Sequence, residues 1–533
     1  MDKRAPTLGA PSRPPPRARA APAAGPRARW ALAALALAAL PLALLSGFTV
    51  DDAWIAPRYA AHLASGLGYR FNAGGPPTDG VTPLPWAPLL APFGGEPLRV
   101  WRAARALGAL AWLAAAAHLG ACAARAAGRK ARALPLAALG ASAPLGAWAC
   151  AGTETGVVTA LVAFACAAPA RARALAAAAC GAAASFRPEL LPFACVVGAF
   201  RSLEPPAPPA HPFSSDSSDS SGSSGPPAPD AEPLAPRPAR PRALSVWPFA
   251  LAVGPWLAVV ALRLALFGRP VPLAVDAKPS DFRHGFAYVV AGLLLGGFPA
   301  LAAAPLALLR RPELSRARWL VAAALAHAAS VAAAGGDWMP LSRLLVPAFP
   351  ALLVAAVDVA ALAPLGWTLA RLAVALAAMA FAWSRAGAAA ASVVGARLPL
   401  VERARRSLDP GEVVAALDVG WLAAAGESRI VDLAGRTDPA IAALPGGHTS
   451  KRVPATLLDA RGVTTLVVLS AEGAPCRAER APAARAVEER LLRDPWVAGA
   501  FEPSDAWASG RLCYVVWRKR SVGGEGAPGP APR

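Results

Sequence analysis

The chain has 533 residues, of which 56% are hydrophobic and only 16% are charged, and its mean hydropathy is +0.42. Soluble globular proteins rarely carry so few charges, so the composition favours an integral membrane protein. The net charge is +20, but the arginines gather in the N-terminal tail and in short turns between apolar segments. That is the positive-inside pattern of membrane topology rather than a continuous basic face, so we expect no nucleic-acid partner.

The first apolar segment follows a basic tail. Residues 1–29 are rich in Pro, Arg and Ala, and we expect them to form a disordered cytoplasmic tail. Residues 30–48 hold no charge, and since no convincing cleavage site follows, they predict a retained first span rather than a signal peptide. Residues 49–97 combine Gly, Pro and aromatic residues and predict a long external loop at the membrane surface.

A transmembrane module is predicted to extend from residue 30 to residue 202. A second span lies near 104–124, and two more flank the turn at 151–156. Residues 174–200 are interrupted by "FRPEL", and neither half is long enough for a comfortable span. We therefore expect a broken or short helical pair there.

A low-complexity linker, residues 203–243, separates this module from a second one at 244–384. The linker is rich in Pro and Ser, lacks core-forming residues, and is expected to be disordered in the cytoplasm. Further spans are predicted near 245–267, 285–308, 317–334, 344–362 and 366–384. The fold class is therefore an α-helical polytopic membrane protein with about eleven crossings, the N-terminus inside and the C-terminus outside.

The hydrophobic pattern changes at residue 385. Strand-like segments alternate with helical ones over 385–520, which predicts a small extracytoplasmic α/β domain, followed by a disordered tail at 521–533. The strand-like segments are 412–420, 428–435, 463–470 and 513–520, and the helical ones are 454–461 and 480–493. Cys476 and Cys513 are the two cysteines of this domain: outside the cytoplasm they would form a disulfide, and the alternative is two unpaired buried thiols.

Charged side chains of the membrane half gather at the ends predicted to lie outside. The acids are Asp51, Asp52, Asp79, Glu154, Glu189, Asp276, Asp281 and Asp337, and the bases are Arg58, Lys278, Arg283 and Arg343. Polar groups that converge on one membrane face indicate a cavity opening there. The alternative is ordinary solvated loop ends. No His, Cys or Asp cluster has metal-ligand spacing, and no Walker or dinucleotide motif is present, so we expect neither a metal nor a soluble nucleotide donor.

Several motifs occur in the order found in one enzyme superfamily. The stretch "DDAWIAPRYAAHLASGLGYRFNAGG" with "TDGVTPLPW" resembles the first external loop of the bacterial GT-C integral-membrane glycosyltransferases, above all the mycobacterial terminal arabinofuranosyltransferase branch. The later motifs "GTETG", "RPEL", "DAKPSDFRHG", "GGDWMPLSRLLVP" and "DVGWLAAAGESRIVDLAGRTDPAIA" resemble further segments of that branch. Pro57 departs from the pattern, because the family usually has an aromatic residue there, and it is predicted to interrupt a helix from Asp52 to Arg58.

The resemblance implies an enzyme that moves a sugar, such as arabinofuranose or another pentose or hexose, from a polyprenyl-phosphate donor. The acceptor would be a cell-envelope glycan, lipid or protein, and the site and C-terminal domain would face the periplasm or exterior from the cytoplasmic membrane. Such transfer needs a base for the acceptor hydroxyl and cations for the leaving phosphate, and no cofactor. The expected roles are catalysis by Asp51 and Asp52, phosphate binding by Arg58, Lys278 and Arg343, and sugar or acceptor binding by Asp79, Glu154, Glu189, Asp337 and Trp338.

Two other functions stay open from the residues alone. A transporter or flippase for a lipid-linked glycan would use the one-sided acids as an ion path, although it needs polar groups near the midplane. A non-catalytic envelope scaffold would use the C-terminal domain for binding, although it has no need of an acidic pair.

Overall fold

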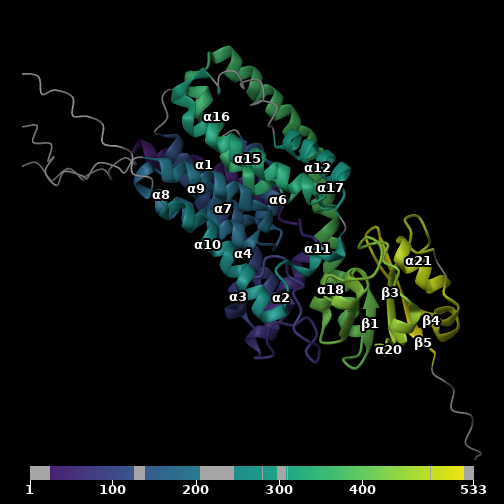
Figure 1. The fold of residues 1–533 in the computed structure, drawn as a ribbon. Coiled ribbons are helices and arrows are strands. Elements are labelled where there is room, and N and C mark those ends of the chain that lie inside the picture. Colours follow the sequence, from purple (N-terminus) through teal and green to yellow (C-terminus); the bar gives the residue numbers. More distant parts are fainter. Residues whose placement is uncertain are drawn as a thin grey trace, which may run out of the picture.

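A computed structural model describes residues 25–124, 138–204, 245–278, 280–296, 308, 310–479 and 482–520. A helical body made by the first three quarters of the chain lies beside a C-terminal sheet domain (Figure 1). The predicted disordered segments 1–29, 203–243 and 521–533 lie outside the described residues except at their edges. The predicted tail ends at residue 29, but α1 (Pro26–Leu44) already begins at residue 26. Its first residue is a proline, which is well suited to the first helical position.

Four helices of the described residues are long and apolar enough to cross a membrane: α1, α4 (Pro97–Ala123), α10 (Trp247–Phe267) and α17 (Leu365–Ser407) up to residue 387. The prediction of about eleven spans is therefore not met. The other apolar helices include α7 (Thr155–Ala167), α8 (Arg173–Phe186), α9 (Leu191–Leu203), α12 (Phe282–Leu295) and α16 (Phe349–Leu362). These five have 13 or 14 residues each, so they are about 20 Å long, against about 30 Å of hydrocarbon.

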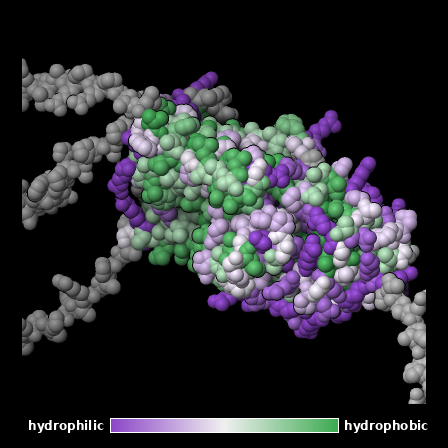
Figure 2. Space-filling view, turned by 60° about the horizontal axis from the view of Figure 1, so that its bottom comes forward, coloured by the Kyte–Doolittle hydropathy of each residue, from purple (hydrophilic) through white to green (hydrophobic). Residues whose placement is uncertain are grey.

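The surface of the helical body is apolar. Figure 2 shows hydrophobic residues over this body and hydrophilic residues gathered over the sheet domain. Large apolar side chains are exposed along α10 and α17, among them Leu257, Leu264, Trp367 and Phe381. An exposed apolar surface of this kind is compatible with a lipid environment.

The broken helical pair predicted around "FRPEL" is confirmed. α8 ends at Phe186, Arg187 is extended as expected before a proline, and the 3-10 helix η4 (Pro188–Leu190) leads into α9. The turn carries Arg187 and Glu189. Behind this pair, α15 (Ser315–Ala333) packs against α9 and α16.

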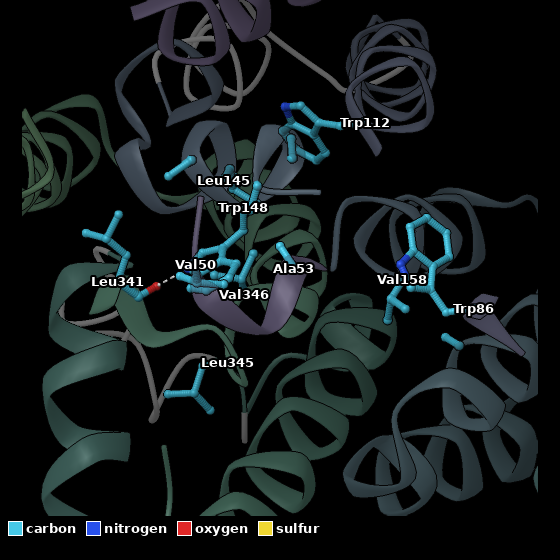
Figure 3. Close-up of a cluster of buried hydrophobic side chains, with 14 of the residues drawn as sticks. Val50, Ala53, Trp86, Trp112, Leu145, Trp148, Val158, Leu341, Leu345 and Val346 are labelled. Carbon is cyan, nitrogen blue, oxygen red and sulfur yellow. Dashed lines mark hydrogen bonds between the residues drawn. The ribbon is translucent and has the colours of Figure 1, made fainter. Parts of the chain in front are cut away.

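The two aspartates lie on a short helix at the start of the loop of residues 49–97. The 3-10 helix η1 (Asp51–Trp54) continues directly into α2 (Ile55–Ala64), and α3 (Trp86–Leu90) follows later in the loop. Pro57 was predicted to interrupt this helix, but it lies in the first turn of α2, where its missing N–H breaks no hydrogen bond. Val50 and Ala53, which flank the pair, are buried in the cluster of Figure 3 together with Trp148.

The C-terminal domain contains a five-stranded mixed sheet with the order β2-β1-β3-β5-β4. Its strands are β1 (Val413–Ala416), β2 (Arg429–Asp432), β3 (Thr465–Leu469), β4 (Phe501–Ser509) and β5 (Leu512–Lys519). The first three strands are parallel and the last two antiparallel. Helices α18 (Val419–Ala425), α19 (Pro439–Ala442), α20 (Ala455–Ala460), α21 (Ala486–Arg493), α22 (Pro495–Ala500) connect them.

One boundary and one strand of this domain differ from the prediction. α17 continues to Ser407, so the sheet domain begins near residue 413 rather than at 385. β4 was not predicted as a strand. Cys476 and Cys513 form a disulfide with their Cα atoms 5.6 Å apart, which is the bonded alternative of the two left open by the sequence.

Candidate functional site

A cavity of about 470 Å³ lies between the loop of residues 49–97, the end of the helical body and the sheet domain. Its apolar wall includes Ile55, Val81 and Trp86. Its charged wall holds three carboxylates and four cations: Asp52, Glu154, Glu189, Arg187, Lys278, Arg343 and Arg436. Five of these seven residues were predicted from the sequence as site residues, and the structure brings them to one cavity.

Asp52 faces this cavity. Arg343 lies 3.5 Å from its Oδ2 atom, and the Nη1 group of Arg436 donates a hydrogen bond to its Oδ1 atom. The side chain is 19% exposed. Two guanidinium groups from distant parts of the chain, one from each domain, therefore converge on one carboxylate.

Asp51 is turned away from the cavity lining. Its two carboxylate oxygens accept hydrogen bonds from the backbone N–H groups of Gly420 and Trp421, both at 3.0 Å, and Arg436 lies 3.5 Å away. Burial and the negative charge of Asp418 raise the pKa of Asp51, although Arg397 and Arg436 oppose the shift. Asp51 thus joins η1 to the start of α18.

Gly420 allows this close approach. A Cβ atom at this position would overlap the backbone carbonyl of Asp51. Any larger residue would push the sheet domain away from η1.

Arg343 is positioned by a buried ion pair and by an unusual turn. Asp337 binds Arg343 at 2.8 Å and Lys278 at 3.3 Å, and its side chain is only 2% exposed. Burial alone would raise the pKa of Asp337, but the charges of Arg343 and Lys278 outweigh burial and hold that pKa well below its usual value. Asp337 therefore stays ionised and fixes both cations at the cavity edge.

The backbone before Arg343 is strained. Leu341 and Ser342 have φ values of 57° and 53°, in the left-handed region that residues other than glycine rarely adopt. The indole N–H of Trp148 donates to the carbonyl oxygen of Leu341 at 3.2 Å, the dashed line in Figure 3. Such strain persists only where the surroundings enforce it, and it is concentrated at functional sites.

Arg187 organises the opposite wall. It pairs with Glu154 at 2.5 Å and with Glu189 at 3.3 Å, and it donates to the Thr155 hydroxyl at 2.8 Å. His327, buried in α15, hydrogen-bonds the carbonyl oxygens of Glu189 and Leu344. The two walls are thereby connected behind the cavity.

Three predicted site residues lie elsewhere. The Arg58 guanidinium is buried and donates to the carbonyl oxygens of Phe71, Gly426 and Ser428 at 2.7–3.1 Å, so it fixes the loop to the sheet domain and does not line this cavity. Asp79 forms a fully buried ion pair with Arg263 at 2.8 Å, because a buried carboxylate needs a cationic partner.

Trp338 is the third of these residues. It is 71% exposed and stacks on His284 with the ring centroids 4.2 Å apart. It lies outside the cavity lining, although its neighbour Asp337 holds two of the lining cations.

Two cavity residues were not predicted. Arg187 occurs in the "RPEL" motif that the sequence did single out, so this motif was the available signal. Arg436 follows β2 in "DLAGRTD", and nothing in the sequence places it opposite Asp52, because its position depends on how the sheet domain docks. Among the described residues, no group of three His, Cys, Asp or Glu side chains is placed to hold a metal ion.

Comparison with known proteins covers one part of the chain. Residues 389–516 match a family described as a domain of unknown function (DUF8728). The match begins inside α17 and ends in β5, so it contains Arg436 and the N–H groups that bind Asp51. No curated protein and no solved structure gives a significant match to the chain.

Proposed function

We propose that this protein is a membrane glycosyltransferase of GT-C type that moves a sugar from a polyprenyl-phosphate donor to a cell-envelope glycan, lipid or protein. The observation that carries the proposal is the cavity itself. Asp52 and four cations line it, and its apolar wall, which includes Ile55, Val81 and Trp86, suits a lipid-anchored substrate.

The four cations would bind the donor phosphate. Arg343 and Lys278 are fixed by Asp337, and Arg187 and Arg436 approach from the other sides of the cavity. Guanidinium groups bind phosphate oxygens in pairs, and their charge stabilises a phosphate that leaves. In a lipid-linked donor, the phosphate would bind the charged wall of the cavity and the lipid chain would contact apolar surface.

Asp52 would act as the general base. The acceptor hydroxyl oxygen forms a bond to the anomeric carbon of the sugar while the bond from that carbon to the phosphate oxygen breaks. The bonding electron pair leaves with the phosphate, and the hydroxyl proton passes to the Asp52 carboxylate. Asp51 would position this carboxylate by fixing η1 to α18, because its own oxygens are already occupied.

The side of the membrane that the cavity faces is part of the same proposal. With the cavity and sheet domain outside the cytoplasm, the donor sugar would lie at the outer surface of the cytoplasmic membrane. The disulfide between Cys476 and Cys513 supports this side, since disulfides persist in oxidising compartments. Glu154 and Glu189, on the cavity wall, would bind sugar or acceptor hydroxyls.

A reconstituted transfer assay tests the proposal. The full chain in lipid nanodiscs is given a polyprenyl-phosphate pentose or hexose and an envelope glycan, and released polyprenyl phosphate and new glycoside are measured. We expect transfer from the lipid-linked donor, and a rise in donor KM of about tenfold or more in Arg343→Gln, from the loss of a charge-assisted hydrogen bond. Arg269→Gln is the matched control, because Arg269 pairs with the exposed Asp276 outside the cavity.

The opposite results are equally clear. No consumption of any lipid-linked donor, or transfer from a soluble nucleotide sugar instead, would overturn the proposal. An equal donor KM in Arg343→Gln and Arg269→Gln would show that the donor does not bind in this cavity.

A further inference from the structure

We propose that Arg436 and Arg343 hold Asp52 inactive before the donor binds, and that the donor phosphate frees this carboxylate by taking over the two guanidinium groups. The base would therefore become competent only when the donor is bound. This inference rests on the proposed function and adds a regulatory role for the sheet domain, which supplies Arg436.

The two guanidinium contacts make Asp52 a poor base. Each of its two carboxylate oxygens is held by a different guanidinium group, Oδ1 by Arg436 and Oδ2 by Arg343. Opposite charges at this distance favour the ionised form of a carboxylate and oppose its protonation. A base must accept a proton in the transition state, so this arrangement resists transfer until the cations are neutralised.

Both guanidinium groups have donors to offer to an anion. The Nε–H groups of Arg436 and Arg343 are buried and have no hydrogen-bond partner among the described residues. Buried donors without partners are rare, so each one calls for an acceptor that the chain itself does not supply. A phosphate presents several oxygens to such a pair, whereas Asp52 presents one oxygen to each arginine.

The main chain that carries Arg436 is fixed, so the exchange requires only side-chain movement. Asp432 accepts hydrogen bonds from the N–H groups of Ala434 and Thr437 at 2.9 and 2.8 Å and from the Thr437 hydroxyl at 3.1 Å. Gly80 packs so closely on this turn that a Cβ atom there would contact Thr437. At Arg343, Trp148 holds the preceding backbone through the Leu341 carbonyl oxygen, and Asp337 keeps the guanidinium group at the cavity.

The acid limb of the pH–rate profile reports the protonation of the Asp52 carboxylate. The charged groups that face it are Arg343 and Arg436 directly, Asp51 on its own element, and Glu154, Glu189, Arg187 and Lys278 around the cavity. His448 lies near Arg436 and Lys278, but burial and these positive charges lower its pKa to about 4. This histidine therefore stays neutral over the range from pH 5 to pH 8.

The test compares the pH dependence of kcat/KM and of kcat for donor. The first reports the free enzyme and the second the donor complex. In the wild type we expect the acid limb of kcat to lie at higher pH than that of kcat/KM, because Asp52 loses its two cations when the donor binds. In Arg436→Gln the acid limb of kcat/KM should shift to higher pH, toward the acid limb of kcat. The donor KM of this variant should rise about tenfold or more.

Controls separate this role from a structural one. Arg436→Lys keeps the charge and should retain separate limbs, and Arg452→Gln, an exposed arginine of the same domain, should behave as the wild type. The inference, but not the proposed function, would be overturned by either of two results. One is an active wild type whose acid limbs of kcat and kcat/KM lie at the same pH, and the other is a folded Arg436→Gln whose acid limbs do not shift. A wild type without any transfer would instead overturn the proposed function.

Discussion

Two adjacent aspartates have different surroundings. The sequence predicted that Asp51 and Asp52 act together at the end of a span, but it could not divide their roles. The division follows from docking: Asp51 meets the N–H groups of α18, whereas Asp52 meets the cavity. The N–H groups that bind Asp51 lie more than 280 positions away along the chain, and so do Arg343 and Arg436, which bind Asp52. No local sequence pattern therefore reveals these contacts.

The strained turn before Arg343 offers a test at the level of one residue. Ser342→Gly should raise the free energy of unfolding by about 1 kcal/mol at most, because relief of strain is offset by the greater entropy of the unfolded chain. We expect transfer to fall by up to about tenfold, since Arg343 is then held less firmly. Thermal unfolding and transfer rates measure the two effects.

Ser342→Ala is the matched control, because it keeps a Cβ atom and removes only the hydroxyl. It should transfer sugar at nearly the wild-type rate. An equal loss in both variants would assign the effect to the hydroxyl group and contradict the role of the strained backbone.

Element boundaries were predicted where a proline or a change in hydropathy marks them. The pair α8 and α9 is an example, because Pro188 interrupts an apolar segment. α17 was cut short in the prediction because charged residues enter after Trp383, although Ala, Leu and Arg favour a helix throughout. β4 was missed because "FEPSDAWAS" is polar and contains Pro503, a combination that only an edge strand tolerates.

The contact of η1 with α18 should depend on one glycine. Gly420→Ala would force its Cβ against the Asp51 carbonyl, and we expect a loss of about 1–3 kcal/mol from this overpacking. Amide hydrogen exchange over α18 should accelerate, and transfer should fall because Arg436 moves with the domain. Gly426→Ala serves as control, because nothing lies within 4 Å of an added Cβ there.

These two variants separate local crowding from a general effect of alanine. Similar exchange over α18 in Gly420→Ala and Gly426→Ala would show that the contact with Asp51 does not hold the domain.

At the scale of the whole molecule, the composition predicted an apolar helical body and a separate sheet domain, and both are present. The number of spans was overestimated, because alanine-rich segments are weakly hydrophobic and several form helices of only 13 or 14 residues. The site was predicted in part: five cavity residues were named, whereas Arg58 and Asp79 were assigned to ligands although they bind protein groups. Charged residues in a sequence do not reveal which are neutralised internally.

The orientation of the molecule can be measured directly. In a chain whose five cysteines outside the disulfide are replaced by alanine, Arg452→Cys should react with a membrane-impermeant maleimide on intact cells. Glu313→Cys, beside the ion pair of Arg316 with Asp358, should react only after permeabilisation. Both residues are exposed, so access depends on the side of the membrane. Reaction of Arg452→Cys only after permeabilisation would reverse the proposed topology.

The central claim is that Asp52, and not Asp51, accepts the proton during sugar transfer. The decisive measurement is the transfer rate of Asp52→Asn, Asp51→Asn and Asp276→Asn beside the wild type, at saturating lipid-linked donor, with folding checked by thermal unfolding. We predict a loss of about 100-fold or more in Asp52→Asn, a smaller loss in Asp51→Asn, whose amide oxygen still accepts an N–H group, and no loss in the exposed Asp276→Asn. Transfer by Asp52→Asn at the wild-type rate, or a greater loss in Asp51→Asn than in Asp52→Asn, would contradict the claim.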